Sequence, residues 1–134
     1  MAGDNYDGEL ALGNGDPWLK YPRYYTNWTL STAKTGNVKA IACGGMFSAC
    51  LTKDGYVYTA GYNYDGEMAI GSFGPYNVNN WTQTLNGSNV SAIACGAGSI
   101  FQIGGGNLCG AGFNYYGQLG VGDTTNRNQW TKCP

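Results

Sequence analysis

The chain of 134 residues has the length of one domain, and its formal net charge is −1, from 7 basic and 8 acidic residues. The charges are scattered singly, so no basic surface is predicted on which nucleic acid or an anionic membrane would bind. No apolar run reaches the roughly 18 to 20 residues of a membrane helix. The first residues are acidic and polar, where a secretion signal would be basic and then apolar. We therefore expect no nucleic acid partner and no membrane insertion.

The cysteines and the lack of histidine restrict the chemistry further. Without histidine, His-based triads and most metal sites are excluded, and we expect no metal and no cofactor. None of the cysteines forms a C-x-x-C pair, so we expect buried, reduced thiols that pack as small apolar groups. A disulfide between Cys43 and Cys95 stays open, because it requires neighbouring repeats to bring the two Cα atoms within about 7 Å. The remaining cysteines are Cys50, Cys109 and Cys133.

An internal repeat is the strongest signal in the sequence. A twelve-residue phrase begins at Ala2 and returns at Ala60 and Ala111, each time with an Asn that is followed three residues later by Gly. A period of about 50 residues is typical of propeller blades or repeat arrays. We predict a single repeat domain over 1–134, with units at approximately 2–36, 37–88 and 89–134. A second phrase, residues 37–44, returns at 89–96 and contains a cysteine in each copy. The repeated Asn, Gly and Cys residues are expected to be structural: Asn5, Asn63, Asn114, Gly66, Gly117, Cys43 and Cys95.

The local pattern within a unit is that of short β-strands. In chain order, strands are predicted at 38–43, 48–52, 56–59 and 81–85, because these runs are rich in β-branched and aromatic residues or alternate between apolar and polar. Asp54-Gly55 is suited to a type I′ hairpin turn between the second and third strands. The 23 glycines argue against long helices. The predicted fold is therefore all-β, with four antiparallel strands in each unit.

These phrases resemble the regulator of chromosome condensation family of repeats. The family unit runs Val-x-x-Ile-Ala-Cys-Gly, Leu-Thr, Asp-Gly-x-Val-Tyr and then Gly-x-Asn-x-x-Gly-Gln-Leu-Gly-x-Gly, which residues 38–44, 51–52, 54–58 and 61–71 follow in order. The resemblance implies β-propeller blades. It also shows departures: alanine stands where the family has Trp before Gly, and Phe47 and Ser99 stand where it has His. We therefore expect unusual blade packing.

The unit count predicts an incomplete ring. About two and a half blades are expected here, whereas the resemblance implies rings of seven. Part of a ring leaves sheet edges and blade faces bare. We expect the ring to be completed by self-association or by a larger assembly, with an excised piece of a longer propeller as the alternative.

The polar groups of the repeat do not form a catalytic constellation. The acidic loops at 5–9 and 63–67 repeat with the fold, and the third copy has Tyr116 and Gln118 in place of acids, so they are interpreted as turn residues. Ser48 and Ser99 have no activating base. We therefore predict a protein that is not an enzyme. The excess of tyrosine on predicted loops favours recognition instead, and the candidate contacts are Tyr21, Tyr24, Tyr25, Tyr62, Tyr64, Tyr115 and Tyr116.

Two functional hypotheses follow. The first is a binding or structural module of a surface assembly, namely a virion, phage tail or decoration protein that recognises a glycan or protein receptor, on a virion or outside the cell. The alternative is an intracellular, cytoplasmic protein-interaction propeller, for which the family resemblance implies guanine-nucleotide exchange or chromatin binding. A low-charge surface rich in Asn, Gly, Thr and Tyr favours the first hypothesis.

Overall fold

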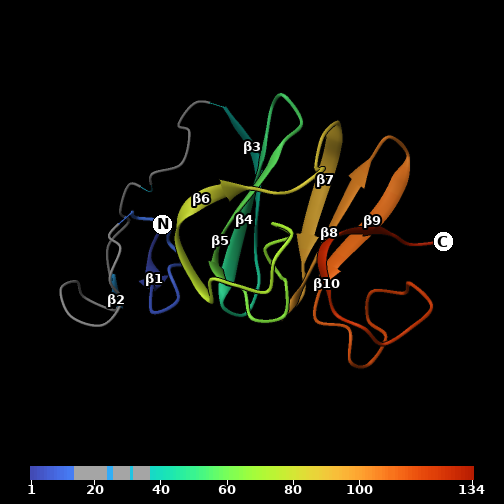
Figure 1. Ribbon diagram of the computed structural model, residues 1–134. Helices are drawn as coiled ribbons and strands as arrows, with labels where there is room; N and C mark the ends of the chain where they lie inside the picture. Colours follow the sequence, from blue (N-terminus) through green and yellow to red (C-terminus); the bar gives the residue numbers. More distant parts are fainter. Residues whose placement is uncertain (14–23, 26–30, 32–36) are drawn as a thin grey trace.

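The computed structural model describes residues 1–13, 24–25, 31 and 37–134, and the described residues form an all-β structure (Figure 1). No helix in these ranges is long and apolar enough to cross a membrane. The strands, in chain order, are β1 (Gly3–Asp4), β2 (Tyr24–Tyr25), β3 (Val38–Cys43), β4 (Phe47–Thr52), β5 (Val57–Tyr62), β6 (Asn77–Gln83), β7 (Val90–Cys95), β8 (Ser99–Gly104), β9 (Asn107–Gly112) and β10 (Arg127–Lys132).

The strands pair into two four-stranded antiparallel sheets and one short pair. The sheet β3-β4-β5-β6 is called the second blade here, and the sheet β7-β8-β9-β10 is called the third blade. β1 pairs with β2, with Gly3 opposite Tyr25. Both blades have a register shift at the same place in their first strand, after Val38 and after Val90. The prediction of an all-β fold is confirmed, and the second and third units each have the four antiparallel strands predicted.

Three local predictions need correction. The third strand of the second blade runs on to Tyr62, because its end pairs with β6. The fourth strand lies at 77–83 and not at 81–85. The Asp54-Gly55 turn is not of type I′: Gly55 has a φ of 87°, but Asp54 is not among the residues with positive φ. The Gly55 N–H bonds the Thr52 carbonyl at 3.0 Å, which is a type I turn followed by a left-handed glycine.

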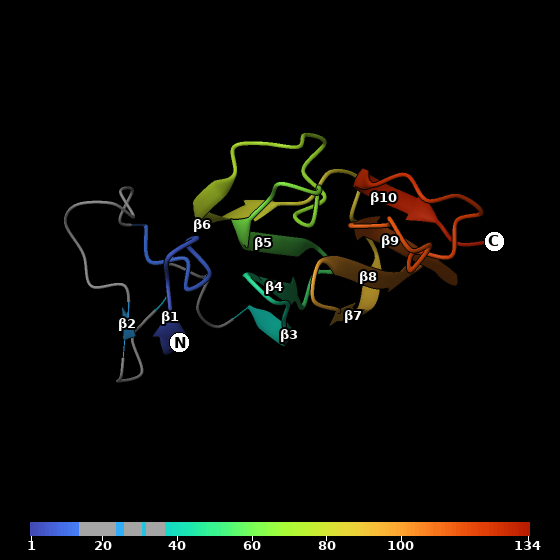
Figure 2. The same ribbon diagram turned by 90° about the horizontal axis from the view of Figure 1, so that it is seen from below.

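The core lies between the two blades. Every residue of β4 is buried, because its sheet is covered on both faces. Leu51 and Val57 of the second blade lie in one apolar cluster with Val90 and Ile100 of the third, and β7 lies against β3 and β4. Figure 2 shows the two sheets side by side. The residues that depart from the family pattern are buried as well: Phe47, Ala60 and Ala111 are at most 2% exposed.

Burial between blades predicts a contrast between two leucines. Leu51 in β4 is 0% exposed, whereas Leu108 in β9 is 46% exposed. We expect Leu51→Ala to lower the free energy of unfolding by about 2 to 5 kcal/mol, since it leaves a cavity between the blades. The matched change Leu108→Ala should cost less than about 1 kcal/mol. Urea denaturation of dilute protein measures both; equal losses would show that the core does not lie between the blades.

Candidate functional site

Each repeat contains the same asparagine-centred loop. The Oδ1 atoms of Asn5, Asn63 and Asn114 accept the backbone N–H found five residues later in the chain, at 3.0, 3.2 and 2.9 Å. Asn63 and Asn114 are fully buried. Their Nδ2 atoms donate across the loop, to the carbonyl oxygens of Ser72 at 3.1 Å and Asp123 at 2.9 Å. One side chain therefore closes each loop from inside.

The acidic residues of these loops accept backbone hydrogen bonds. Glu67 Oε2 accepts the Asp65 N–H at 2.9 Å, and Glu9 accepts the equivalent N–H at 3.0 Å. In the third loop the neutral Gln118 accepts the Tyr116 N–H at 3.0 Å. Burial raises the pKa of Glu67 to about 7, against the opposing effect of its backbone donors. Since a neutral amide makes the same bond, the contact does not depend on a carboxylate.

The loops also connect one blade to the next. Asp65 Oδ1 accepts the Asn126 amide at 2.9 Å, and the Gly71 N–H donates to the Asn128 carbonyl at 2.7 Å. A Cβ atom at Gly66 would lie 2.6 Å from the carbonyl oxygen of Arg127, so this approach requires glycine.

The first loop repeats this arrangement on the second blade. The Gly13 N–H donates to the Asn79 carbonyl at 2.9 Å. Asn77, with its amide turned so that both of its polar atoms are satisfied, donates to Asp7 Oδ1 at 2.9 Å. In both loops, therefore, the glycine and the aspartate bond residues that lie in the last strand of the following blade or directly before it.

A tryptophan completes each blade-to-blade connection. Trp81 Nε1 donates to the Ser31 hydroxyl at 2.8 Å, and Trp130 Nε1 donates to the Thr84 hydroxyl at 3.0 Å. Each tryptophan lies on the last strand of its blade. The Trp-Thr phrase of the sequence therefore marks a hydrogen bond across the blade interface.

The tyrosines form two exposed aromatic groups at one end of the blades. Figure 1 shows the loops after β5 and after β9 at the same end, which is the lower end in that view. In the first group Tyr64 lies 5.3 Å from Tyr76 and 6.2 Å from Tyr62, between ring centroids. The second group is Phe113, Tyr115 and Tyr116.

Exposure differs within and between these groups. Tyr115 and Tyr116 are 67% and 79% exposed, their rings 5.0 Å apart. The sequence analysis missed two residues of these groups. Tyr76 lies outside the repeated phrases, and Phe113 is not a tyrosine, although it occupies the position of Tyr62 in its repeat. Tyr21 lies outside the described residues, and Tyr24 and Tyr25 form β2.

The cysteines are free thiols, but the expectation that they are all buried is wrong. Cys50 is buried, Cys43 is exposed, and the other three are intermediate. Burial raises the pKa of Cys50 to about 11 and, together with the nearby Cys43, raises that of Cys95 to about 12. These two thiols are therefore protonated at neutral pH and poorly nucleophilic. Within the described ranges, no group of three or more His, Cys, Asp or Glu side chains is placed to hold a metal ion.

Comparison with known proteins identifies the repeat. Residues 38–67 match the family model of the regulator of chromosome condensation (RCC1) repeat. The bovine secretion-regulating guanine nucleotide exchange factor is 30% identical over 120 residues, which are 89% of this chain and 25% of that protein. The human X-linked retinitis pigmentosa GTPase regulator is 34% identical over 89 residues, 66% of this chain and 9% of that protein.

A solved structure shows the same fold. The crystal structure of Prp20p from Saccharomyces cerevisiae, described with its binding to Gsp1p and histones, has a TM-score of 0.81 at 19% identity. The match covers 99% of this chain and 33% of that one. The chain thus spans a quarter or less of the two curated relatives and a third of the solved structure.

These matches overturn the preferred functional hypothesis. The two curated relatives named above are a bovine exchange factor and a human GTPase regulator, the solved structure is a yeast protein, and none of the three is a virion or phage attachment protein. The surface composition that suggested a virion is equally compatible with a propeller of the regulator of chromosome condensation type. The prediction that the chain is not an enzyme is not confirmed either, because one relative is an exchange factor.

Closure of the loop by Asn63 yields a stability prediction. Asn63→Ala removes the acceptor of the Met68 N–H and the donor to Ser72, both within a closed loop. We expect the free energy of unfolding to fall by about 2 to 4 kcal/mol, since buried backbone groups lose their partners. The control is Asn107→Ala, because the half-buried Asn107 donates only to a carbonyl two residues away. An unchanged denaturation midpoint for Asn63→Ala would contradict this role.

The buried Glu67 predicts a dependence of stability on pH. Its pKa is raised from 4.5 to about 7 in the folded chain. The contribution of Glu67 to the free energy of unfolding is therefore full below pH 4.5 and is lost as the pH rises through 7, by up to about 3 kcal/mol. We expect Glu67→Gln to be more stable than the parent at pH 7 and equal to it near pH 4. The pKa values of Asp65 and Glu9 are also raised. The stability of both proteins therefore still falls with increasing pH, but less steeply in Glu67→Gln.

The matched control for Glu67 lies in the third loop. Gln118 makes the same backbone contact but is exposed, so Gln118→Glu should leave the pH profile unchanged. Thermal unfolding between pH 4 and 8 measures all three proteins. If the unfolding temperatures of Glu67→Gln and of the parent change with pH in the same way, Glu67 is not the source of the pH dependence.

The chain has both the repeat pattern and the fold of β-propeller blades. The repeated phrases match the family unit, the strands form four-stranded blades, and a solved member of the fold superposes on almost the whole chain. The loops that set the repeat apart also join its blades. Residues 38–67 are a repeat of the regulator of chromosome condensation type, and the chain has the fold of β-propeller blades.

Proposed function

We propose that this chain is a protein-interaction module that promotes guanine-nucleotide exchange on a small GTPase. The observation that carries the proposal is the match over 89% of the chain to a guanine nucleotide exchange factor. A second relative bears the name of a GTPase regulator. We treat residues 1–134 as one repeat domain of three units within this function.

Exchange requires contact and not covalent chemistry. A protein that binds the nucleotide-free form of its partner more tightly than the loaded form accelerates release of the nucleotide. The absence of a catalytic constellation from the sequence therefore does not oppose the proposal. The net charge of −1 supports a protein partner over DNA, which requires basic side chains.

The tyrosine-bearing loops are the proposed contact surface. Tyr115 and Tyr116 extend from a loop that Asn114 closes from inside, so their backbone is held before binding. Arg127 and Asp123, joined by an ion pair at 2.6 Å, brace the far side of this loop. Exposed aromatic rings on a rigid loop provide contact area at a low entropic cost.

The test is release of a fluorescent guanine nucleotide from a panel of small GTPases. We expect the chain to bind one of them and to accelerate release, and we expect Tyr115→Ala with Tyr116→Ala to weaken both by at least about tenfold. Tyr56→Ala is the control, because Tyr56 is exposed beside the hairpin turn at the other end of the second blade. Binding that survives the double substitution would exclude this surface, and no binding to any GTPase would exclude the function.

A further inference from the structure

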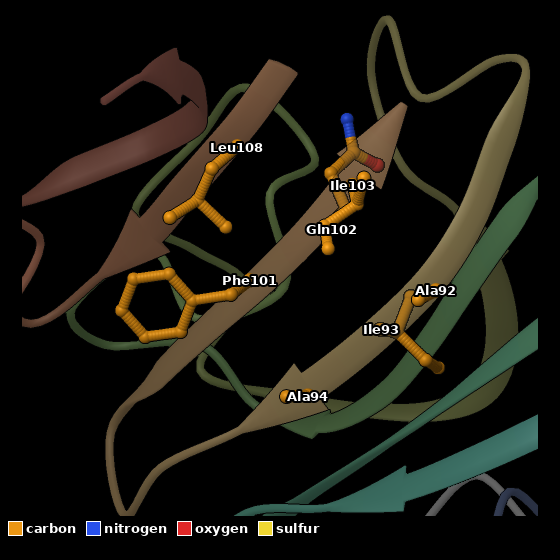
Figure 3. A pocket seen from close by; sticks show the side chains of 7 residues that line it. All are labelled: Ala92, Ile93, Ala94, Phe101, Gln102, Ile103 and Leu108. Carbon is orange, nitrogen blue, oxygen red and sulfur yellow. The ribbon is translucent and has the colours of Figure 1, made fainter. Parts of the chain in front are cut away.

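The fold separates charges that are scattered along the sequence. The described acidic residues other than Asp54 all lie in or beside the three asparagine-centred loops, numbered here in chain order: Asp4, Asp7, Glu9, Asp65, Glu67 and Asp123. The first loop bonds Asn77 and Asn79 at the start of β6, so it lies at the same end of the blades as the other two. Asp54 lies in the hairpin turn between β4 and β5, at the opposite end. The pocket on the face of the third blade has no charged residue in its lining (Figure 3).

The described basic residues are distributed in the opposite way. Lys53 follows β4 in the hairpin turn, and Lys39 lies near the start of β3, beside the end of β4. Lys132 is the last residue of β10, whereas the third loop precedes this strand. Of the described basic residues only Arg127 lies at the loop end, and its ion pair with Asp123 at 2.6 Å offsets its charge. The described part of the loop end therefore has a net negative charge, although that of the whole chain is only −1.

An exposed aromatic surface lies within this negative end, on the second loop. Tyr64 and Tyr76 are 54% and 59% exposed, with ring centroids 5.3 Å apart, and Phe73 in the same loop is 48% exposed. The Asn63 N–H donates to the Tyr76 carbonyl at 2.8 Å, so the backbone beneath the two tyrosine rings is fixed. The second loop lies between the first and third loops in the chain, and all three are described.

A carboxylate lies beside each of these two tyrosines. The half-buried Asp65 follows Tyr64 directly in the chain. Tyr76 is followed by Asn77, whose amide donates at 2.9 Å to the buried Asp7 of the first loop. Buried and half-buried charges are screened less by salt and water than exposed charges. The rings of Tyr64 and Tyr76 are therefore exposed in a negative field.

The titration of a neighbouring phenol supports this description. The ring centroid of Tyr62 lies 6.2 Å from that of Tyr64. The pKa of Tyr62 is raised, first by burial and then by the charges of Glu67, Asp65 and Asp7. A raised phenol pKa means that a further negative charge is unfavourable at this position. A positive charge is favourable there for the same reason.

We propose that the surface formed by Tyr64 and Tyr76 binds a basic segment of a protein partner through an arginine side chain. A guanidinium group stacks on the face of an aromatic ring and is attracted to carboxylates nearby. Its flat shape suits a ring face better than the compact, strongly hydrated ammonium group of lysine does. An acidic partner is repelled by the same charges. The proposal goes beyond the exchange activity, because it requires no GTPase and rests on the second loop and not on Tyr115 and Tyr116.

Fluorescence anisotropy of a labelled peptide of alternating arginine and glycine, titrated with the full chain, tests the surface. We expect binding that weakens with added salt. It should fall by at least about tenfold when Tyr64→Leu and Tyr76→Leu are combined, because leucine keeps apolar area but has no ring face. Tyr56→Leu is the control, since Tyr56 is 37% exposed at the hairpin end. The corresponding peptide of lysine and glycine should bind more weakly than the arginine peptide.

Two aspartates provide a matched test of the charge. Asp65 and Asp54 each accept an asparagine amide, from Asn126 at 2.9 Å and from Asn37 at 3.2 Å, but they lie at opposite ends of the blades. Replacement by asparagine removes one negative charge and keeps a carbonyl oxygen for this hydrogen bond. We expect Asp65→Asn to weaken binding of the arginine peptide by about threefold and Asp54→Asn to leave it unchanged.

Four results would overturn the proposal. They are a parent chain that does not bind the arginine peptide, full binding by the double leucine variant, equal affinity for the lysine peptide, and equal losses for the two asparagine variants. The last result would show that only the net charge of the chain matters. If circular dichroism shows that the double variant has lost its fold, Tyr76→Leu alone decides the question. Because the assay contains no GTPase, a failure of the nucleotide-release experiment leaves its result unaffected.

Discussion

The structure depends on the covering of sheet faces by neighbouring sheets. A four-stranded blade with apolar residues on both faces cannot bury them within itself, so each blade needs a neighbour. β4, with all six residues buried, is the direct result: one set of its side chains faces each neighbouring layer. Apolar contact between the blades supplies the stabilisation, as the cluster of Leu51, Val57, Val90 and Ile100 shows.

The asparagine-centred loops set the geometry of that contact. Apolar faces slide easily, whereas hydrogen bonds have fixed lengths and directions. Asp65, Gly71 and Trp130 each make one polar contact across the interface, and these contacts recur one blade earlier. The arrangement is unfavourable for Glu67, because burial of its carboxylate raises its pKa. In the third loop the neutral amide of Gln118 accepts the same backbone hydrogen bond. A repeat can therefore be destabilised by the position that it occupies in the array.

The relatives of the chain, and not its surface composition, indicate its class of function. Low charge and abundant Asn, Thr and Tyr describe an exposed surface but do not say what it contacts. The relatives direct attention to GTPases, and the structure offers a rigid aromatic end on two adjacent blades. The proposed contact surface includes Tyr116, a position at which the third unit departs from the first two.

The sequence by itself determined the repeat, the all-β class and the four strands of a unit. The spacing of the repeated phrases and the alternation of apolar and polar residues are local features, and they recur from one unit to the next. It also indicated that the acidic loops are turn residues, since Gln118 replaces an acid in the third copy. Only the tertiary structure decided which face is covered. Leu51 and Leu108 are both leucines in β-strands, yet one is buried and the other is half exposed. Burial depends on what lies beyond the sheet, and a blade's neighbour is about 50 residues away in the chain. The sequence did not show that Tyr76 belongs to the first aromatic group for the same reason, because Tyr76 meets Tyr64 only when the loop after β5 folds back on itself.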